Sequence, residues 1–194
     1  MVELNEKFWS DRYNEGNTGW DIGYVSTPIK EYIDQLEDKE IKILIPGAGN
    51  AYEAEYLWQN GFKHVDVLDL SRIPLESLGN RVSDWPANQL IEGDFFKHTG
   101  SYDLIFEQTF FCALDPKLRG NYVAKMKELL KGGGKLVGLM FKIPLFDDRP
   151  PFGGSEKDYL PLFENDFHIM KMEEAYNSIE PRAGSELWVS MTPI

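Results

Sequence analysis

The fold is decided by residues 41–71, which read IKILIPGAGN AYEAEYLWQN GFKHVDVLDL S. The apolar run at 41–45 predicts a short strand covered on both faces, because such strands read as continuous apolar residues. Residues 51–59 predict a helix that ends at an Asn-Gly pair, and 64–70 predict a second strand. Strand, helix and strand in this order indicate a pair of parallel strands joined by a crossover helix.

The same alternation continues along the chain. We expect further helices at 5–14, 27–38, 74–80, 116–131 and 157–163, and further strands at 89–91, 102–106 and 135–141. The helix at 116–131 should stop at the glycine triplet that follows it. Two last strands, at 167–174 and 186–192, have no helix between them and should pair as an antiparallel edge. The pattern therefore predicts an α/β fold that is doubly wound, with a mostly parallel seven-stranded sheet, an antiparallel edge strand and helices on both faces.

Composition excludes several classes of protein. The 194 residues carry 20 basic and 32 acidic side chains, a net charge of −12, and such a surface repels the phosphates of nucleic acids. No apolar run approaches the length of a membrane span, and no basic region followed by an apolar one opens the chain. A lone cysteine, Cys112, excludes an intrachain disulfide, so we expect a cytoplasmic protein. We also expect no metal, because His64, His98 and His168 show no ligand spacing.

A glycine turn follows the first strand, at Gly47 and Gly49. Glycine there lets the backbone approach a ligand closely, and the next helix can turn its N-terminus toward an anionic group. Asp69 ends the second strand about twenty residues later, the spacing at which a carboxylate meets the two hydroxyls of a ribose. Each feature alone also fits a plain turn or a helix N-cap, and the pair fits a nicotinamide dinucleotide as well as other adenosine cofactors.

Two more strand ends carry polar and aromatic residues. Asp94 and Phe95 follow the third strand, where an acid and a ring suit an adenine, although a turn aspartate beside a core phenylalanine is the alternative. Residues 107–111 follow the fourth strand and should lie at the carboxyl edge of the sheet. We expect the next residue, Cys112, to belong to the core, because nothing beside it in the sequence would activate its thiol.

Longer sequence motifs narrow the choice of protein family. They are Phe8-Trp9-Ser10-Asp11-Arg12-Tyr13, Gly19-Trp20-Asp21-Ile22-Gly23, Ile45-Pro46-Gly47-Ala48-Gly49, Phe110-Phe111-Cys112-Ala113-Leu114-Asp115-Pro116 with Arg119, Leu130-Lys131-Gly132-Gly133-Gly134, and Pro150-Pro151-Phe152. With Asp69 and Asp94-Phe95, the combination resembles class I S-adenosylmethionine-dependent methyltransferases. Within them it is most similar to the thiopurine methyltransferase family and its plant-type thiol and halide methyltransferases. The resemblance covers nearly the whole chain and implies a Rossmann-like methyltransferase fold that binds S-adenosylmethionine and releases S-adenosylhomocysteine.

The resemblance also implies roles. Residues 1–38 would form an N-terminal helical lid on a Rossmann-like core of residues 39–194, both within one methyltransferase domain. The implied cofactor-binding residues are Trp9, Tyr13, Trp20, Gly47, Gly49, Asp69, Leu70, Asp94, Phe95 and Glu107. Among them, Gly47 would contact the methionine portion, Asp69 the ribose, and Asp94 with Phe95 the adenine. The implied catalytic residues are Asp21, Gln108 and Arg119.

Two positions depart from the plant-type pattern. Tyr13 stands where those members have another tryptophan, and Gln108 where they carry a tyrosine beside the methyl-transfer site. The choice of acceptor therefore stays open at this point.

Methyl transfer from a sulfonium needs orientation and removal of water more than acid–base chemistry. We expect Phe110, Phe111 and Phe152 to form a dry pocket, Arg119 to steer an anion, and Asp21 to be available as a proton acceptor for a neutral thiol. The expected partner is a small methyl acceptor, namely a thiol or sulfide, a halide or thiocyanate, with a thiopurine-like heteroaryl thiol as the alternative, and the expected state is a monomer. Two other classes remain open: a nicotinamide oxidoreductase, and a cofactor-binding module without turnover.

Overall fold

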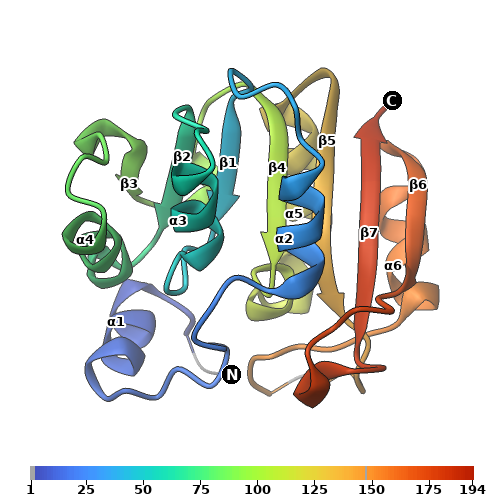
Figure 1. The fold of residues 1–194 in the computed structure, drawn as a ribbon. Helices are drawn as coiled ribbons and strands as arrows, with labels where there is room; N and C mark the ends of the chain where they lie inside the picture. Colours follow the sequence, from blue (N-terminus) through green and yellow to red (C-terminus); the bar gives the residue numbers. More distant parts are fainter. Residues whose placement is uncertain (1–2, 147) are drawn as a thin grey trace.

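The computed structural model describes residues 3–146 and 148–194. Seven strands form one sheet in the order β3-β2-β1-β4-β5-β7-β6 (Figure 1). Their bounds are β1 Ile43–Pro46, β2 Val65–Asp69, β3 Leu90–Glu92, β4 Tyr102–Gln108, β5 Leu130–Phe141, β6 Phe167–Glu174 and β7 Glu186–Pro193. Strands β1 to β5 are parallel, and β7 runs antiparallel to both β5 and β6. The prediction of a doubly wound, mostly parallel sheet with an antiparallel edge is confirmed; the reversed strand lies one place inside that edge.

Helices cover both faces of the sheet. They are α1 Glu6–Asn14, α2 Thr27–Asp34, α3 Tyr52–Gln59, α4 Arg72–Arg81, α5 Arg119–Leu129 and α6 Glu156–Phe163. In Figure 1, α2 and α3 lie in front of the sheet and α5 lies behind it. Local sequence explains several helix starts: the Asn5 side chain accepts the Phe8 N–H at 3.0 Å, and Ser155 forms a capping box with Asp158.

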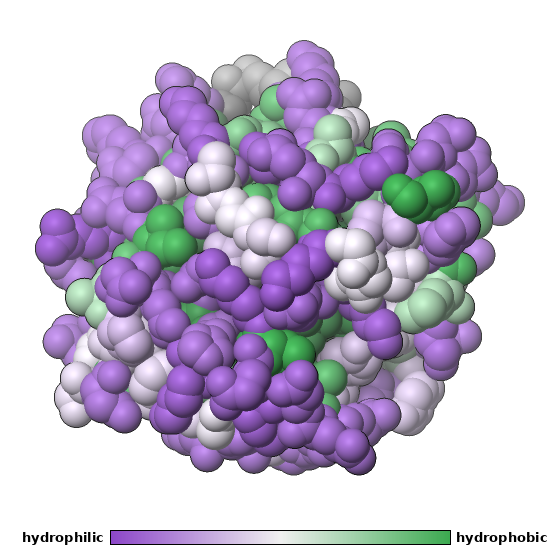
Figure 2. All heavy atoms as spheres, turned by 90° about the horizontal axis from the view of Figure 1, so that it is seen from above, coloured by the Kyte–Doolittle hydropathy of each residue, from purple (hydrophilic) through white to green (hydrophobic). Residues whose placement is uncertain are grey.

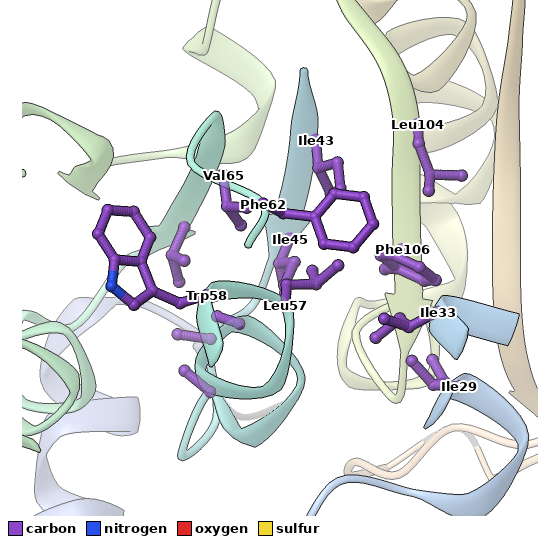
Figure 3. Packing of buried hydrophobic residues seen from close by; sticks show 14 of the residues in the cluster. Ile29, Ile33, Ile43, Ile45, Leu57, Trp58, Phe62, Val65, Leu104 and Phe106 are labelled. Atoms are coloured by element: carbon purple, nitrogen blue, oxygen red, sulfur yellow. The ribbon is translucent and has the colours of Figure 1, made fainter. Parts of the chain in front are cut away.

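Two apolar clusters, one on each face, hold the helices to the sheet. On the face of α2 and α3, Ile29 and Ile33 pack with Leu57 and Phe62 against strand residues such as Phe106, all of them buried (Figure 3). A second cluster joins α5 and α6 to the opposite face through Tyr122, Phe163 and other buried side chains. Burying an apolar side chain of this size contributes about 1.5–3 kcal/mol, so these clusters dominate the stability of the fold.

The predicted end of the long helix is wrong. Helix α5 stops at Leu129, and the glycine triplet 132–134 lies inside strand β5 instead of ending a helix. Tyr102 of β4 pairs with Leu130, whereas Leu104 pairs with Lys135. The register between β4 and β5 therefore shifts across the glycine triplet. A Cβ on Gly134 would lie 2.9 Å from the Tyr102 carbonyl oxygen, so only glycine fits this close approach. Helix α2 is also shorter than predicted and ends at Asp34.

The carboxyl ends of the parallel strands share one edge of the sheet, drawn at the bottom of Figure 1, where α1 also lies. The opposite end of the molecule, drawn in Figure 2, is mostly hydrophilic, with hydrophobic residues scattered among polar ones. No helix within the described part of the chain is both long and apolar enough to cross a bilayer. In a doubly wound fold, ligands bind beyond the carboxyl ends of the parallel strands. We therefore expect a ligand site at the end of the sheet where α1 lies.

Candidate functional site

A cleft that is open to solvent lies at the carboxyl ends of β1 and β4. Its lining comes from the N-terminal segment, the turn after β1, the start of α3 and the end of β4: Trp20, Asp21, Ile22, Tyr24, Ile45, Gly47, Ala48, Gly49, Asn50, Ala51, Tyr52, Glu53, Phe106, Gln108 and Thr109. Of the predicted site residues, it brings together Trp20, Asp21, Gly47, Gly49 and Gln108.

The glycine turn forms one wall of the cleft. Gly47 and Gly49 have φ angles of 69° and 53°, a left-handed region that favours glycine. A Cβ on Gly47 would lie 2.5 Å from the Phe110 ring, so no larger residue fits there. The turn leads into α3 through Ala51, which is itself left-handed at φ 55°. The backbone of this turn therefore packs closely against the Phe110 ring and lines the cleft at Gly47 and Gly49.

Asp69 stands beside that turn at the end of β2. Its Oδ2 accepts the Ala48 N–H and its Oδ1 accepts the Ser71 N–H, each at 2.8 Å. Loss of water around the carboxylate raises the pKa of Asp69 to about 6, although backbone N–H groups favour the charged form. Leu70, the next residue, is half-buried. A carboxylate that both fixes the turn and keeps further lone pairs suits a ligand with neighbouring hydroxyl groups.

Three aromatic residues of the N-terminal segment gather over the turn. The Trp20 ring meets those of Trp9 and Tyr13 edge to face, with centroids 5.8 and 5.5 Å apart. A Cβ on Gly49 would meet the Trp20 ring at 3.7 Å, so this ring lies directly against the turn. Burial, and to a smaller extent the charges of Asp69 and Asp21, raise the pKa of Tyr13.

The N-terminal segment is tied down at two further points. The Ser10 hydroxyl lies 2.7 Å from that of Ser71, and the Arg182 guanidinium donates to the Trp20 carbonyl oxygen at 2.7 Å. Ser71 caps α4, and Arg182 belongs to the short 3₁₀ helix Glu180–Arg182 near the C-terminus. The cluster of aromatic rings is therefore held from both sides of the cleft.

The turn after β4 has a strained backbone. Thr109 has a φ of 62°, which is rare for a β-branched residue and costs about 1–3 kcal/mol. Glu107 supports this turn from below: its fully buried carboxylate accepts the Phe111 N–H at 2.9 Å and the Tyr122 hydroxyl at 2.6 Å. Burial raises the pKa of Glu107 to about 7. The side chain of Glu107 therefore holds the loop in place and does not line the cleft.

Arg119 also lies outside the lining of the cleft. It is buried, with its guanidinium over the Phe111 ring and one nitrogen donating to the carbonyl oxygens of Phe152 and Gly153, at 3.1 and 2.8 Å. The expectation that Phe111 and Phe152 line a pocket needs the same correction, because both rings are buried in the protein. These contacts fix the loop that carries Phe152.

Asp94 and Phe95 both make contacts within the protein. Asp94 caps the short 3₁₀ helix Phe95–Lys97 by accepting the Phe96 N–H at 2.9 Å, and it pairs with Lys97 at 3.6 Å. The Phe95 ring is buried against Phe96, Phe110 and Tyr122. Cys112 is buried as expected, and burial raises the pKa of its thiol.

Asp21 and Gln108 face the cleft from opposite sides. The Asp21 side chain is exposed at the mouth, where it accepts hydrogen bonds from Asn50 and from the Gly23 N–H. Gln108 lies deeper, and its Oε1 accepts the Ser26 hydroxyl at 2.8 Å. Sequence reasoning missed the next neighbour, Glu53, a buried carboxylate from the first turn of α3 that also lines the cleft.

The residues present fit a ligand that combines a diol with an amino-acid portion. The glycine turn offers backbone at the wall of the cleft, Asp69 supplies acceptor oxygens, and aromatic rings lie against the turn. No group of three or more His, Cys, Asp and Glu side chains is placed to hold a metal ion within residues 3–146 and 148–194.

Comparisons with known proteins identify the family. Residues 4–191 match the family model "Thiopurine S-methyltransferase (TPMT)". The chain is 30% identical to a probable thiol methyltransferase 2 of Arabidopsis thaliana, over 96% of this chain and 84% of that protein. It is 29% identical to thiocyanate methyltransferase 1 of Brassica oleracea, over 94% and 83%.

A solved structure is similar in fold. It is the 1,6-didemethyltoxoflavin-N1-methyltransferase of Burkholderia thailandensis, crystallised with S-adenosylhomocysteine, with a TM-score of 0.77 and 16% identity over 97% of this chain and 86% of that one. The glycine turn, the carboxylate after β2 and the whole-length match to the family model lead to one conclusion. The chain belongs to the thiopurine S-methyltransferase family and is an S-adenosylmethionine-dependent methyltransferase.

Proposed function

We propose that the chain methylates a small nucleophile, namely a thiol or sulfide, a halide or thiocyanate. The observation that carries this proposal is the lining of the cleft, where Gln108 and Asp21 offer polar groups beside the glycine turn. The names of the plant relatives, a thiol and a thiocyanate methyltransferase, support the same acceptor class.

The cofactor would lie along the turn after β1. We assign its methionine portion to the backbone at Gly47 and Gly49, and its ribose hydroxyls to Asp69 and the neighbouring backbone at Leu70. The adenine would lie toward residues 94–95, where Asp94 is half-buried and offers a carboxylate oxygen. Glu107 acts on the cofactor only through the loop that it holds.

Bound there, S-adenosylmethionine supplies a methyl carbon attached to a positively charged sulfur. The chain's own residues orient the acceptor and exclude water, as an in-line displacement requires. Gln108 and Asp21 face the acceptor from the two sides of the cleft. Arg119 positions the loop that contains Phe152, and we propose no direct contact between Arg119 and the acceptor.

The N-terminal segment up to residue 38 would act as a lid on the core within one domain. Trp9, Tyr13 and Trp20 form its inner surface, and the bond from Arg182 to the Trp20 carbonyl oxygen fastens it. Residues 1 and 2 of this segment lie outside the described residues. Since ligands cannot pass a closed lid, the segment must move for the cofactor to enter and for the product to leave.

We further propose a cytoplasmic monomer that acts on small molecules and not on nucleic acid. The net charge of −12 supports this, because it disfavours a phosphate backbone. Size-exclusion chromatography with light scattering tests the monomer: a mass near 22.3 kDa is expected, and a stable dimer would contradict it.

The test begins with calorimetric titration of S-adenosylmethionine and S-adenosylhomocysteine, with NAD as the control. Binding of the first two without NAD, followed by methylation of alkyl thiols, sulfide, iodide or thiocyanate, is the expected result. Turnover of heteroaryl thiols alone would replace the small acceptor by a thiopurine-like one. Binding without turnover of any acceptor would indicate a binding module.

A further inference from the structure

Three polar side chains from distant parts of the chain meet at the inner wall of the cleft, and a fourth, Arg182, acts on one of them through its charge. Glu53 comes from the first turn of α3, Ser26 precedes α2, Gln108 ends β4, and Arg182 lies near the C-terminus. Glu53 and Ser26 are only 9% and 3% exposed, yet Glu53 and Gln108 line the cleft. We call these four residues the inner polar cluster.

Hydrogen bonds give the cluster a fixed arrangement. Ser26 occupies the N-cap position of α2, but its hydroxyl makes no bond to that helix and donates to the Gln108 Oε1 instead. The Ser26 N–H donates to the Glu53 Oε1 at 3.3 Å. Gln108 also favours the carboxylate form of Glu53. Glu53 and Gln108 thus line the same cleft and are joined through Ser26.

The charges around Glu53 are unbalanced. The charge of Arg182 favours the Glu53 carboxylate, but the two Arg182 hydrogen bonds go to the Trp20 carbonyl oxygen at 2.7 Å and to Glu186 at 3.3 Å. Asp21 adds a negative charge at the mouth of the cleft. Burial is the largest influence and raises the pKa of Glu53, while Arg182 and Gln108 act in the other direction. A carboxylate in such surroundings accepts a proton more readily than one in water.

A purely structural role for Glu53 would look different. Acids favour the first turn of a helix because of its dipole, and Glu55 of the same turn shows this in the usual way, partly exposed and paired with Arg81 at 2.8 Å. Glu53 forms no salt bridge within the described part of the chain. Burying an unpaired carboxylate costs several kcal/mol, and such groups in clefts are frequent in catalysis.

We propose that Glu53 is the general base that accepts the proton of a neutral thiol acceptor. This inference rests on the proposed function. The S–H bond breaks and its proton moves to a Glu53 carboxylate oxygen, while the electron pair stays on the acceptor sulfur. That pair forms the new bond to the methyl carbon, and the electron pair of the broken carbon–sulfur bond stays with the cofactor's sulfur. The proton then leaves Glu53 for solvent.

A base of this kind predicts different behaviour for different acceptors. Thiocyanate and iodide carry no proton, so they need no base, whereas an alkyl thiol does. Replacing Glu53 by glutamine (E53Q) keeps the size and the hydrogen bond from the Ser26 N–H but removes the base. General bases contribute about 10²–10⁴-fold, so kcat for an alkyl thiol should fall at least about 100-fold. Turnover of thiocyanate should stay within about threefold, and so should the calorimetric affinity for S-adenosylhomocysteine.

Two matched variants complete the set. E128Q changes an exposed glutamate of α5 that pairs with Lys125, far from the cleft, and should behave as wild type with both acceptors. D21N removes the other carboxylate that lines the cleft and should keep the thiol-to-thiocyanate ratio of the wild type. Selective loss of thiol turnover in D21N, with none in E53Q, would move the base to Asp21 and overturn the proposal.

The pH dependence of thiol methylation by the wild type gives a second test, which needs no variant. If Glu53 is the base, log kcat/KM for an alkyl thiol should be level between the pKa of Glu53 and that of the thiol. A slope of one up to the thiol pKa would mean that only free thiolate reacts, which would overturn the proposal. Equal losses for both acceptors in E53Q would also overturn it. If the wild type methylates no thiol and no anion, the proposed function itself fails, a result distinct from any of these.

Discussion

Replacing Glu107 by glutamine should remove a pH dependence that this buried carboxyl gives to the stability of the protein. Glu107 is fully buried, and its pKa of about 7 compares with an ordinary value of 4.5. In glutamine, the amide oxygen can still accept the Phe111 N–H, and the amide nitrogen can donate to the Tyr122 hydroxyl oxygen, but the Tyr122 O–H proton loses its acceptor. The variant therefore removes the titrating charge at the cost of one hydrogen bond, a cost that does not change with pH.

The size of the effect follows from the pKa values. An acid with a raised pKa binds more protons when folded than when unfolded between pH 4.5 and 7. Its contribution is therefore most favourable below pH 4.5 and is lost as the pH rises through 7. At 1.36 kcal/mol for each unit of pKa, the loss is about 3 kcal/mol. The advantage of E107Q over wild type should accordingly grow by about 3 kcal/mol between pH 4.5 and pH 8.

Urea unfolding followed by tryptophan fluorescence at several pH values measures this difference. Subtracting wild type from variant cancels every other titrating group, and the exposed variant E128Q should give a difference that does not change with pH. A difference between E107Q and wild type that stays constant from pH 4.5 to pH 8 would refute the reasoning. It would mean that Glu107 has the same pKa in the folded and the unfolded chain.

Three other predictions concern the cleft and the sheet. Asp69→Ala should weaken S-adenosylhomocysteine binding about 10- to 100-fold by calorimetry, since each hydrogen bond to a charged group is worth about 1.5–3 kcal/mol; unchanged affinity would contradict the ribose assignment. Trp20→Ala should weaken the same binding and speed cofactor dissociation in stopped-flow experiments, because the lid loses the ring that lies on Gly49; an unchanged dissociation rate would argue against a lid. Gly138→Ala should fail to fold or lose several kcal/mol of stability in thermal melts, because its Cβ would overlap the Glu107 carbonyl oxygen; a wild-type melting temperature would contradict this.

Most of the fold could be predicted because its signals are local. The apolar run before the glycine turn and the alternation after it fix a parallel sheet, and predicted strands such as 167–174 agree with the structure residue by residue. The glycine triplet misled the prediction because glycine ends helices in isolated sequence, whereas here it lets β5 pass close to the Tyr102 carbonyl oxygen. That approach depends on a neighbouring strand, which periodicity along one segment cannot reveal.

The site was predicted unevenly for the same reason. A backbone feature such as the turn at Gly47 is specified by the residues that form it, so the sequence was enough to locate it. The direction of a side chain depends on what surrounds it: Glu107 and Arg119 follow the right strand and loop, but the core encloses both. Motif position thus located elements that surround the cleft, such as the glycine turn, without deciding which side chains line it.

Glu53 could have been found from the sequence by one specific signal. In a helix, residues four apart lie on the same face, so Glu53 shares the buried face of α3 with Leu57, while Glu55 shares the outer face with Gln59. A charged residue at a core position of an amphipathic helix is a local conflict that the chain must compensate elsewhere. Here the buried glutamate follows closely after the glycine turn. A carboxylate that serves a ligand site would show this combination of burial and position.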